Sequence, residues 1–581
     1  MRAATRKNPP RARGGGPAAG WWRGLAGWSA ERRPLHRRCA AVPLPVNGED
    51  LWARLSWLAV PVALFAASPA LAQNSRQITP YIELGQVVVT DFDDSLTYTT
   101  VAAGIDANVQ TRRVQVQASY RYERRIPYDG RLEDLDIHTG LARAAVQVAR
   151  PLTIEAGALA TRTRSDVRGA APGVLAGNVA NIGQLYAVYA GPTLATQAGP
   201  LSVSALYRFG YTKFQGPSIP STIPGQPPLD VFDDSTSHLA TGSISLPANV
   251  YLPVGITLSG AWARDDAGQL AQRYDGKYGR GDVVWPVLPT LALTAGAGYE
   301  NIQVSQRDIL LGADGQPVLD GRGRFQIDPL GQRRIAYDFN GVYYDGGFIW
   351  RPSPRTQLEV HAGERYGSFT AIGQFTYQPS KSVAIRVSGY DGIQTFGRQV
   401  QGGLAAAPTA FTPPTNPFGQ DFNGCVFGPQ GGAAGNCLNA ALQSASTSAY
   451  RARGIDAVVS VNRGRWAYGL GVGYANRRYV APNGGTGVVV AGLQDESVYF
   501  QAYVQRQLDA KTTIDANVFA NYFQSGIFGA PGVHGVGATT ALTRRFGRLG
   551  VVGALGIYHS GQDGFGDVTS LQALLGARYN F

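Results

Sequence analysis

Charged residues are scarce in this sequence: Asp, Glu, Lys and Arg make up 16% of its 581 residues, whereas soluble globular proteins carry about 25%. Methionine occurs once, at position 1. Gly, Ala, Val, Thr, Gln, Asn and Tyr fill the deficit, and this mixture suits strands with one apolar face and one uncharged polar face. The length is compatible with several soluble domains or with one large barrel.

Long apolar runs are also missing. Beyond residue 72, no stretch approaches the roughly 18 consecutive apolar residues of a membrane-spanning helix. A multi-helix membrane protein is therefore excluded. Any crossing of a bilayer has to use strands, which leave a weaker trace in a sequence.

Residues 51–72 contain the three parts of a secretory signal peptide, in order. Arg54 supplies the basic part, an apolar run follows, and Ala-Leu-Ala precedes the expected cleavage point between Ala72 and Gln73. A short buried helix is the alternative, but the small residues at the end favour export. We therefore expect residues 73–581 to form the mature chain.

Residues 1–50 precede that signal and carry ten Arg or Lys against three acidic residues. They are rich in Gly, Pro and Arg and show no periodicity, so we expect a disordered extension. A basic arm for nucleic acid or lipid is one interpretation. The other, which we favour, is a start codon assigned upstream of the true one, with translation beginning at Val46 or Leu51. We accordingly expect no nucleic-acid partner.

From Ile78 to the end, apolar and polar residues alternate with a period of two. Over residues 114–122, Val, Val, Ala, Tyr and Tyr alternate with Gln, Gln, Ser and Arg. Successive side chains of a strand point to opposite faces, so one face is apolar and the other polar. The same pattern occurs in residues 201–212, 466–474 and 514–522.

A soluble β-sandwich alternates too, but three features favour a membrane barrel. The runs last roughly 10 to 14 residues, and a bilayer-crossing strand needs about 9 to 11. Tight turns alternate strictly with longer loops, as in outer-membrane barrels. Aromatic residues, which favour membrane interfaces, lie at both ends of the runs: Trp285, Trp350 and Trp466 near tight turns, and Tyr122, Tyr211, Trp262 and Tyr522 toward longer loops. The sequence therefore predicts an all-β fold, a single antiparallel up-and-down barrel of about 22 strands in the bacterial outer membrane.

The final run, LQALLGARYNF, places Leu575, Ala577, Tyr579 and Phe581 on one face. It resembles the C-terminal strand of bacterial outer-membrane proteins, which ends in an aromatic residue and is recognised by the barrel-assembly machinery. We therefore expect outer-membrane lipid and that machinery as partners.

The first two hairpins also resemble a known group. RQITPYIELGQVVVTDFDD (76–94) and TRRVQVQASYRYERR (111–125) are similar to β-barrel porin families that include the barrels associated with exopolysaccharide export and with the PEP-CTERM/exosortase system. The likeness follows the hairpin rhythm over residues 73–581. It implies a pore-like outer-membrane protein, with polysaccharide export as a candidate activity, and it transfers no functional residue.

Cys425 and Cys437 lie in the longest expected loop, roughly 397–447, and Cys39 precedes the signal. Exported proteins meet an oxidising compartment, so we expect a disulfide that makes a compact flap able to cap or constrict the pore. A metal site is the alternative, but neighbouring histidines and further cysteines are missing from the loop.

Charged residues on the polar faces are candidates for lining the lumen: Arg121, Arg125, Arg208 and Arg386. In a lumen they would mildly favour anions, and pairing with acidic residues that stiffens the wall is an equal alternative. Two acidic loop clusters, Asp91, Asp93, Asp94 and Asp230, Asp233, Asp234, are interpreted as solvated turns or contacts with lipid rather than as Ca²⁺ sites.

We expect neither an enzyme nor a cofactor or metal, because a lone histidine on a strand is more often a polar wall residue; the mature chain has His138, His238, His361, His534 and His559. The leading hypothesis is a channel for polar solutes or a polymer. A TonB-dependent receptor also uses 22 strands but needs a plug domain, for which the few residues between 73 and 78 leave no room. A structural or adhesive barrel with partner-binding loops is the main alternative, and an outer-membrane hydrolase is a lesser one.

Overall fold

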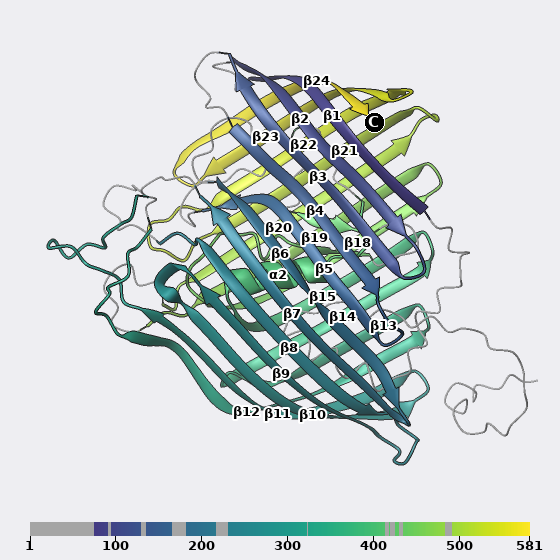
Figure 1. Ribbon diagram of the computed structural model, residues 1–581, viewed down its shortest axis with the longest axis vertical. Helices are drawn as coiled ribbons and strands as arrows, with labels where there is room; N and C mark the ends of the chain where they lie inside the picture. Colours follow the sequence, from purple (N-terminus) through teal and green to yellow (C-terminus); the bar gives the residue numbers. More distant parts are fainter. Residues whose placement is uncertain are drawn as a thin grey trace, which may run out of the picture.

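The computed structural model describes residues 75–90, 95–128, 135–165, 182–216, 230–321, 324–412, 418, 424–428, 434–482 and 491–581. Twenty-two long strands form one antiparallel sheet that closes on itself (Figure 1). The predicted fold class and strand number are therefore confirmed. Among the described helices, none has the length and apolar character needed to cross a bilayer.

The strands follow one another around the ring in chain order. They are β1 (Ser75–Thr90), β2 (Ser95–Gln110), β3 (Val114–Pro127), β4 (Leu135–Gln147), β5 (Leu152–Arg164), β6 (Ile182–Ala198), β7 (Leu201–Gln215), β8 (Asp234–Leu246), β9 (Gly255–Ala267), β10 (Arg273–Leu288), β11 (Leu291–Arg307), β12 (Arg333–Ser353), β13 (Thr356–Arg365), β14 (Ser368–Ser380), β15 (Val383–Gln394), β18 (Tyr450–Arg463), β19 (Trp466–Tyr479), β20 (Gln494–Gln507), β21 (Thr512–Gln524), β22 (Val533–Phe546), β23 (Leu549–Gln562) and β24 (Phe565–Asn580).

Alternation along each strand sorts the side chains between the outside and the inside of the ring. In β7, Tyr207 and Phe209 are 39% and 43% exposed on the outer face, whereas Arg208 between them is 5% exposed on the inner face. In β19, Trp466, Tyr468 and the apolar residues that follow at every second position are exposed in the same way. The outer wall is thus apolar and aromatic, and the polar faces point inward.

The last strand closes the ring. β24 pairs with β1, from Tyr81 opposite Asn580 to Thr90 opposite Leu571. The Phe581 amide donates to the Pro80 carbonyl oxygen (3.0 Å). Leu575, Tyr579 and Phe581 are exposed on the outer face. The shared apolar face predicted for this strand is present, next to the seam between first and last strands.

The expected strict alternation of tight turns and long loops is wrong at several connections. Two tight turns lie at the end of the barrel that carries most of the longer loops, which we call the loop end. There, β13 and β14 are joined by Tyr366 and Gly367 alone, and β23 and β24 by Asp563 and Gly564. Tyr366 and Gly367 both have positive φ (57° and 65°), which matches the twist of a two-residue hairpin turn. At the opposite end, the connection between β8 and β9 runs over residues 247–254. Tight turns need only suitable backbone angles, so either end accepts them.

Candidate functional site in the barrel lumen

The interior of the barrel holds the described residues between β15 and β18 (395–412, 418, 424–428 and 434–449), which we call the lumen segment. Its helix α2 (Phe396–Ala406) lies between the walls (Figure 1) and begins at Thr395, whose side chain accepts a hydrogen bond from the Arg398 amide. Phe396, Val400 and Leu404, spaced four apart, are buried. They share a hydrophobic cluster with the inner wall: Leu141, Leu159, Leu185, Ala187, Tyr189, Phe214 and Ala267. The sequence predicts that these residues form the longest loop. In the structure they fold into the barrel, where the inner wall covers their apolar side chains.

Polar side chains fasten α2 to two sides of the wall. The Ser237 hydroxyl donates to Gln401 Oε1, and Gln401 Nε2 donates to Thr212 Oγ1 (3.1 Å). From another part of the ring, the Tyr450 hydroxyl donates to Gln399 Oε1 (2.6 Å). Buried polar groups without partners are costly, so these bonds favour one position of the helix.

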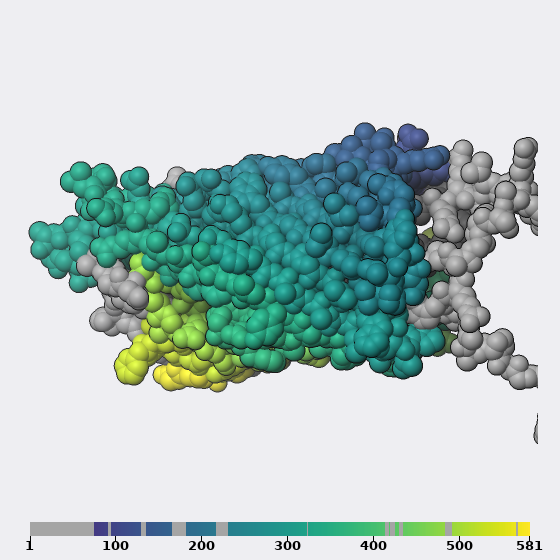
Figure 2. Space-filling model, turned by 90° about the horizontal axis from the view of Figure 1, so that it is seen from below, coloured from purple at the N-terminus to yellow at the C-terminus, as the bar shows by residue number. Residues whose placement is uncertain are grey.

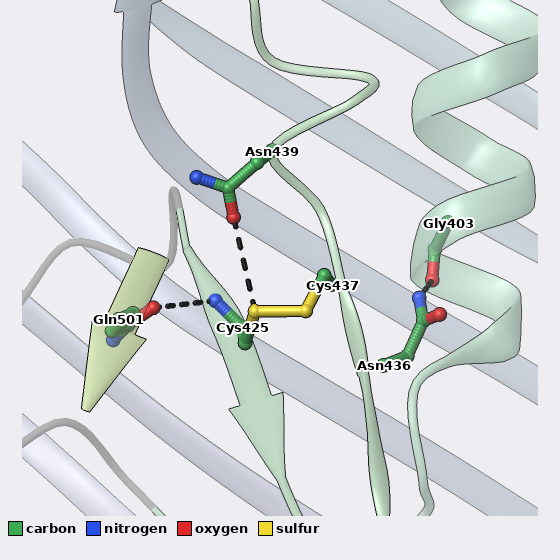
Figure 3. Close-up of a disulfide and its surroundings, with 6 residues drawn as sticks. All are labelled: Gly403, Cys425, Asn436, Cys437, Asn439 and Gln501. Carbon is green, nitrogen blue, oxygen red and sulfur yellow. Dashed lines mark hydrogen bonds between the residues drawn. A yellow bond between two sulfur atoms is a disulfide. The ribbon is translucent and has the colours of Figure 1, made fainter. Parts of the chain in front are cut away.

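The two cysteines form a disulfide inside the barrel. Cys425 and Cys437 are joined (Figure 3) and lie opposite each other in a small hairpin of β16 (Cys425–Phe427) and β17 (Gly435–Cys437). The Cys425 amide donates to Gln501 Oε1 of β20 (2.7 Å). Asn436 Nδ2 donates to the Gly403 carbonyl oxygen (3.1 Å), which connects the hairpin to α2. The disulfide hairpin therefore lies within the lumen and touches the wall.

Glycines on the inner face of β19 make room for this hairpin. A β-carbon at Gly471 would overlap Cys425 Sγ, and one at Gly469 would overlap the Phe427 ring. The alternation of apolar residues with glycine in this strand thus has a packing reason: large side chains face outward, and their small neighbours accept the lumen segment.

Arg477 holds the end of the lumen segment. Its side chain is 1% exposed, and its Nη atoms donate to the carbonyl oxygens of Ala440 (2.8 Å), Ala441 (3.3 Å) and Ser444 (3.1 Å). Its guanidinium also lies over the Tyr450 ring, 4.8 Å from the centroid. One wall arginine thus satisfies three carbonyl groups of a stretch that has no regular secondary structure.

The lumen segment also reaches the wall near the seam. Gln117 of β3 accepts from the Phe411 amide (3.0 Å) and donates to the Phe411 carbonyl oxygen. Phe418 packs in a cluster with Val87, Tyr98, Ala541 and Ala554 of β1, β2, β22 and β23. Together with the contacts of α2 and the hairpin, these anchors spread around the ring, so the segment spans the lumen.

Three of the four expected lumen arginines contact polar or acidic side chains of the wall. Arg121 Nε lies 2.8 Å from Glu83 and also pairs with Glu123. Arg125 Nε lies 2.7 Å from the same Glu123. Arg386 Nε donates to Ser388 Oγ (3.1 Å). All three are buried on the inner face, in an arrangement that stiffens the wall.

Arg208 belongs to a different arrangement. Its guanidinium carbon lies 4.8 Å from the centroid of Tyr189, and that of Arg143 lies 5.3 Å from the same centroid. Glu155 is a buried acidic neighbour whose charge acts on both arginines. Among the described residues, none forms a hydrogen bond with the Arg143 guanidinium or the Glu155 carboxylate. We call these four residues the arginine cluster; its charge is positive, and part of its hydrogen-bonding capacity is unused.

Sequence reasoning missed Arg143 and Tyr189. Arg143 occurs in LARAAV, where Leu141 and Ala145 share its inner face. Both faces of β4 are apolar there, so the alternation that marks lumen residues elsewhere is weak. The arginine itself, in an otherwise apolar run, was the available signal.

The acidic cluster around Asp230 and Asp233 connects separate loops, whereas the sequence predicted a solvated turn or a lipid contact. Asp230 Oδ1 accepts from Gln269 Nε2 (2.6 Å) and from the Phe325 amide (3.0 Å). Burial raises the pKa of the Asp230 carboxyl to about 7. Asp233 pairs with Arg324. Asp230 thus links the loop before β8 to Gln269, between β9 and β10, and to the loop after β11. Asp91, Asp93 and Asp94, like Ala72 and Gln73, lie outside the described residues.

The histidines fall into three settings. His361 lies between Asp345 and Glu359 on the inner wall (3.1 and 3.0 Å). His238 stacks on Trp262, and His138 lies beside Tyr122. His534 and His559 lie 5.7 Å apart, measured between ring centroids.

No family model and no curated protein matches this chain. Solved structures with a similar fold include the FrpB iron transporter from Neisseria meningitidis (F5-1 variant, apoprotein), with TM-score 0.40, 10% identity and coverage of 88% of this chain and 82% of that one. The ferric-catecholate import receptor Fiu from E. coli K12, open form, gives TM-score 0.40, 10% identity and coverage of 86% and 81%. OccAB4 from Acinetobacter baumannii gives TM-score 0.27, 10% identity and coverage of 88% and 99%. The likeness extends to the barrel architecture and no further.

Proposed function

We propose that this chain is an outer-membrane channel for polar solutes, closed at rest by the lumen segment. The observation that carries the proposal is the hydrophobic cluster inside the ring, which joins α2 to the wall. A barrel of 22 strands is wide enough to enclose a lumen, and here a folded piece of the same chain lies inside it. Passage requires the segment to move. The apolar, aromatic outer face supports a position in the outer membrane.

The arginine cluster supports anionic solutes as the class that passes. Arg143 and Arg208 outnumber the acidic Glu155, and the free hydrogen-bonding capacity of Arg143 suits a carboxylate, sulfate or phosphate group. Small organic anions and acidic polysaccharides share this chemistry. Export of a polysaccharide, implied by the resemblance of the first hairpins, is the narrower form of the proposal.

Planar-bilayer recording on refolded protein tests the channel. Gln394 and Tyr450 are paired neighbours on adjacent strands, so a short Gly-Ser linker can replace residues 396–448 without opening the ring. We expect low conductance from the complete chain and a large increase from the shortened one. A shortened chain that shows heat-modifiable mobility of a folded barrel, yet conducts no ions, would contradict the proposal.

Ion selectivity tests the solute class. The double variant Arg143→Gln, Arg208→Gln in the shortened chain should shift the reversal potential toward cations. Arg124→Gln is the matched control, because Arg124 pairs with Asp136 on the exposed outer face. An equal shift in both variants would contradict an anion-selective lumen. Blocking of the current by acidic oligosaccharides but not by small carboxylates would favour polysaccharide.

A second function, binding of a partner by external loops, rests on a separate observation. The connection between β11 and β12 projects beyond the strands (Figure 2) and is shaped by bridges between Ile309 and Ile327, Leu311 and Pro317, and Leu319 and Phe325. Leu330 in this loop is 92% exposed. If the complete and shortened chains are both silent in bilayers, an adhesive or structural barrel becomes the better description.

A further inference from the structure

Two histidines and an aspartate from three adjacent strands meet near the loop end of the barrel. His534 is the second residue of β22, His559 lies near the end of β23, and Asp567 lies near the start of β24. Each offers one ligand atom, and these atoms all lie within 4.8 Å of one another. Asp567 reaches both rings: Oδ1 lies 3.9 Å from His534 Nε2, and Oδ2 lies 3.9 Å from His559 Nε2.

Strand register puts all three side chains on the outer face. They lie two residues, or a multiple of two, from Val536, Ile557 and Leu571, which are 48%, 48% and 40% exposed. The cluster is therefore outside the lumen and separate from the proposed channel. The side chains of His534, His559 and Asp567 are 36%, 41% and 53% exposed, so an ion in solution has access.

Gly561 creates the space in which the three side chains converge. It is the cross-strand partner of His534, and a β-carbon at this position would overlap Asp567 Oδ1 and the His534 ring. The pairing of β23 with β24 shifts register between Ser560 and Gln562. Such an irregularity in strand pairing changes the direction in which nearby side chains point.

A hydrogen bond orients one of the two rings. His559 Nδ1 lies 2.8 Å from Thr569 Oγ1, its cross-strand partner. This contact leaves Nε2 for the carboxylate side of the cluster. Histidines that bind metals almost always use their other ring nitrogen in this way, and loss of such a partner typically lowers metal affinity about 10- to 100-fold.

We propose that His534, His559 and Asp567 bind a divalent transition-metal ion, Zn²⁺ or one of similar preference, with a further coordination position open to solvent. Two imidazoles and a carboxylate are a zinc ligand set, whereas Ca²⁺ and Mg²⁺ prefer oxygen ligands alone. Bonds of about 2.0–2.1 Å place tetrahedral ligand atoms about 3.3 Å apart, and small rotations of these exposed side chains reach that spacing. The bound ion would join β22, β23 and β24 beside the β24–β1 seam.

Zinc titration of the complete chain tests the site. The protein should be purified without a polyhistidine tag, stripped with EDTA, and titrated with Zn²⁺ in detergent by calorimetry. We expect one Zn²⁺ per chain, unaffected by excess Ca²⁺. His534→Ala, His559→Ala and Asp567→Asn should each weaken binding at least about tenfold, and Thr569→Val should weaken it in the range typical of a lost orienting partner.

Matched controls separate the site from general histidine binding. His238→Ala removes a strand histidine that stacks on Trp262 instead of facing an acid, and Asp563→Asn removes another acid of the same rim; both should bind Zn²⁺ as the unchanged chain does. Heat-modifiable mobility confirms that each variant is folded. The proposal is overturned if the folded chain binds no Zn²⁺, if the His534→Ala, His559→Ala double variant binds it equally well, or if Ca²⁺ displaces it.

Discussion

Cys425 Sγ packs directly on the Cα position of Gly471, so closely that a β-carbon at residue 471 would overlap the sulfur. The disulfide hairpin of the lumen segment is thus seated on a strand that has no side chain at the contact. The small size of residue 471 in the wall is thus tied to the position of the disulfide hairpin in the lumen.

Substitution of Gly471 should dislodge the hairpin. Gly471→Val adds atoms to a filled space, and overpacking of this kind costs typically about 1–3 kcal/mol. We expect a lower unfolding temperature in heat-modifiable electrophoresis and a higher open probability in bilayers. Gly279→Val is the control, because nothing lies within 4 Å of a β-carbon at that position. Equal effects of the two variants would show that the contact with Cys425 does not matter.

Removal of the Arg477 guanidinium should loosen the end of the lumen segment. Arg477→Met leaves the carbonyl groups of Ala440, Ala441 and Ser444 without their donor, and hydrogen bonds to charged groups contribute about 1.5–3 kcal/mol each. Faster cleavage of residues 438–449 by proteinase K should follow. Arg478→Met provides the comparison on the exposed face of the same strand; cleavage at the same rate in both variants would argue against the anchor.

Opening of the disulfide should destabilise the lumen segment while leaving the strands intact. Cys425→Ser with Cys437→Ser removes a cross-link across a sequence separation of 12, worth about 3 kcal/mol in the chain-entropy model. Protein that starts at residue 73, and so lacks Cys39, should react with a maleimide only after reduction, and the double variant should conduct more often than the parent. Two reactive thiols in unreduced protein would refute the disulfide.

The link between the external loops should weaken as pH rises. Asp230 has its pKa raised by burial from 3.8 to about 7, so the folded state keeps a proton that the unfolded state loses at lower pH. The stability from this group is therefore complete below about pH 4 and is lost as pH rises through 7. Proteinase K should cleave the loop of residues 308–332 faster at pH 8 than at pH 5.5.

Asp230→Asn keeps the Oδ1 acceptor and cannot ionise. The ratio of its cleavage rate to that of the parent should therefore fall as pH rises. A constant ratio across this range would rule out Asp230 as the titrating group. The ratio also cancels the pH dependence of the protease itself.

Much of the barrel wall could be predicted, because the face that each side chain takes depends only on its position along the strand. Tyr207, Arg208 and Phe209 alternate in the sequence and alternate between outside and inside in the structure, since the period of a strand fixes which face each side chain takes. The strand number followed from repeating that rule. The turn pattern followed it less well, because a tight turn such as Tyr366-Gly367 depends on backbone angles that either end of a barrel permits.

The sequence by itself determined the barrel, the paired faces of its strands and the proximity of the two cysteines, because each depends on neighbours along the chain. Only the tertiary structure decided where the lumen segment goes. Its position depends on contacts such as Leu404 with the wall cluster and Gln117 with Phe411, which are 294 residues apart. The same holds for His534, His559 and Asp567, which strand register brings together. The alternation of residues along a strand carries no information about such contacts, since they join residues far apart in the sequence.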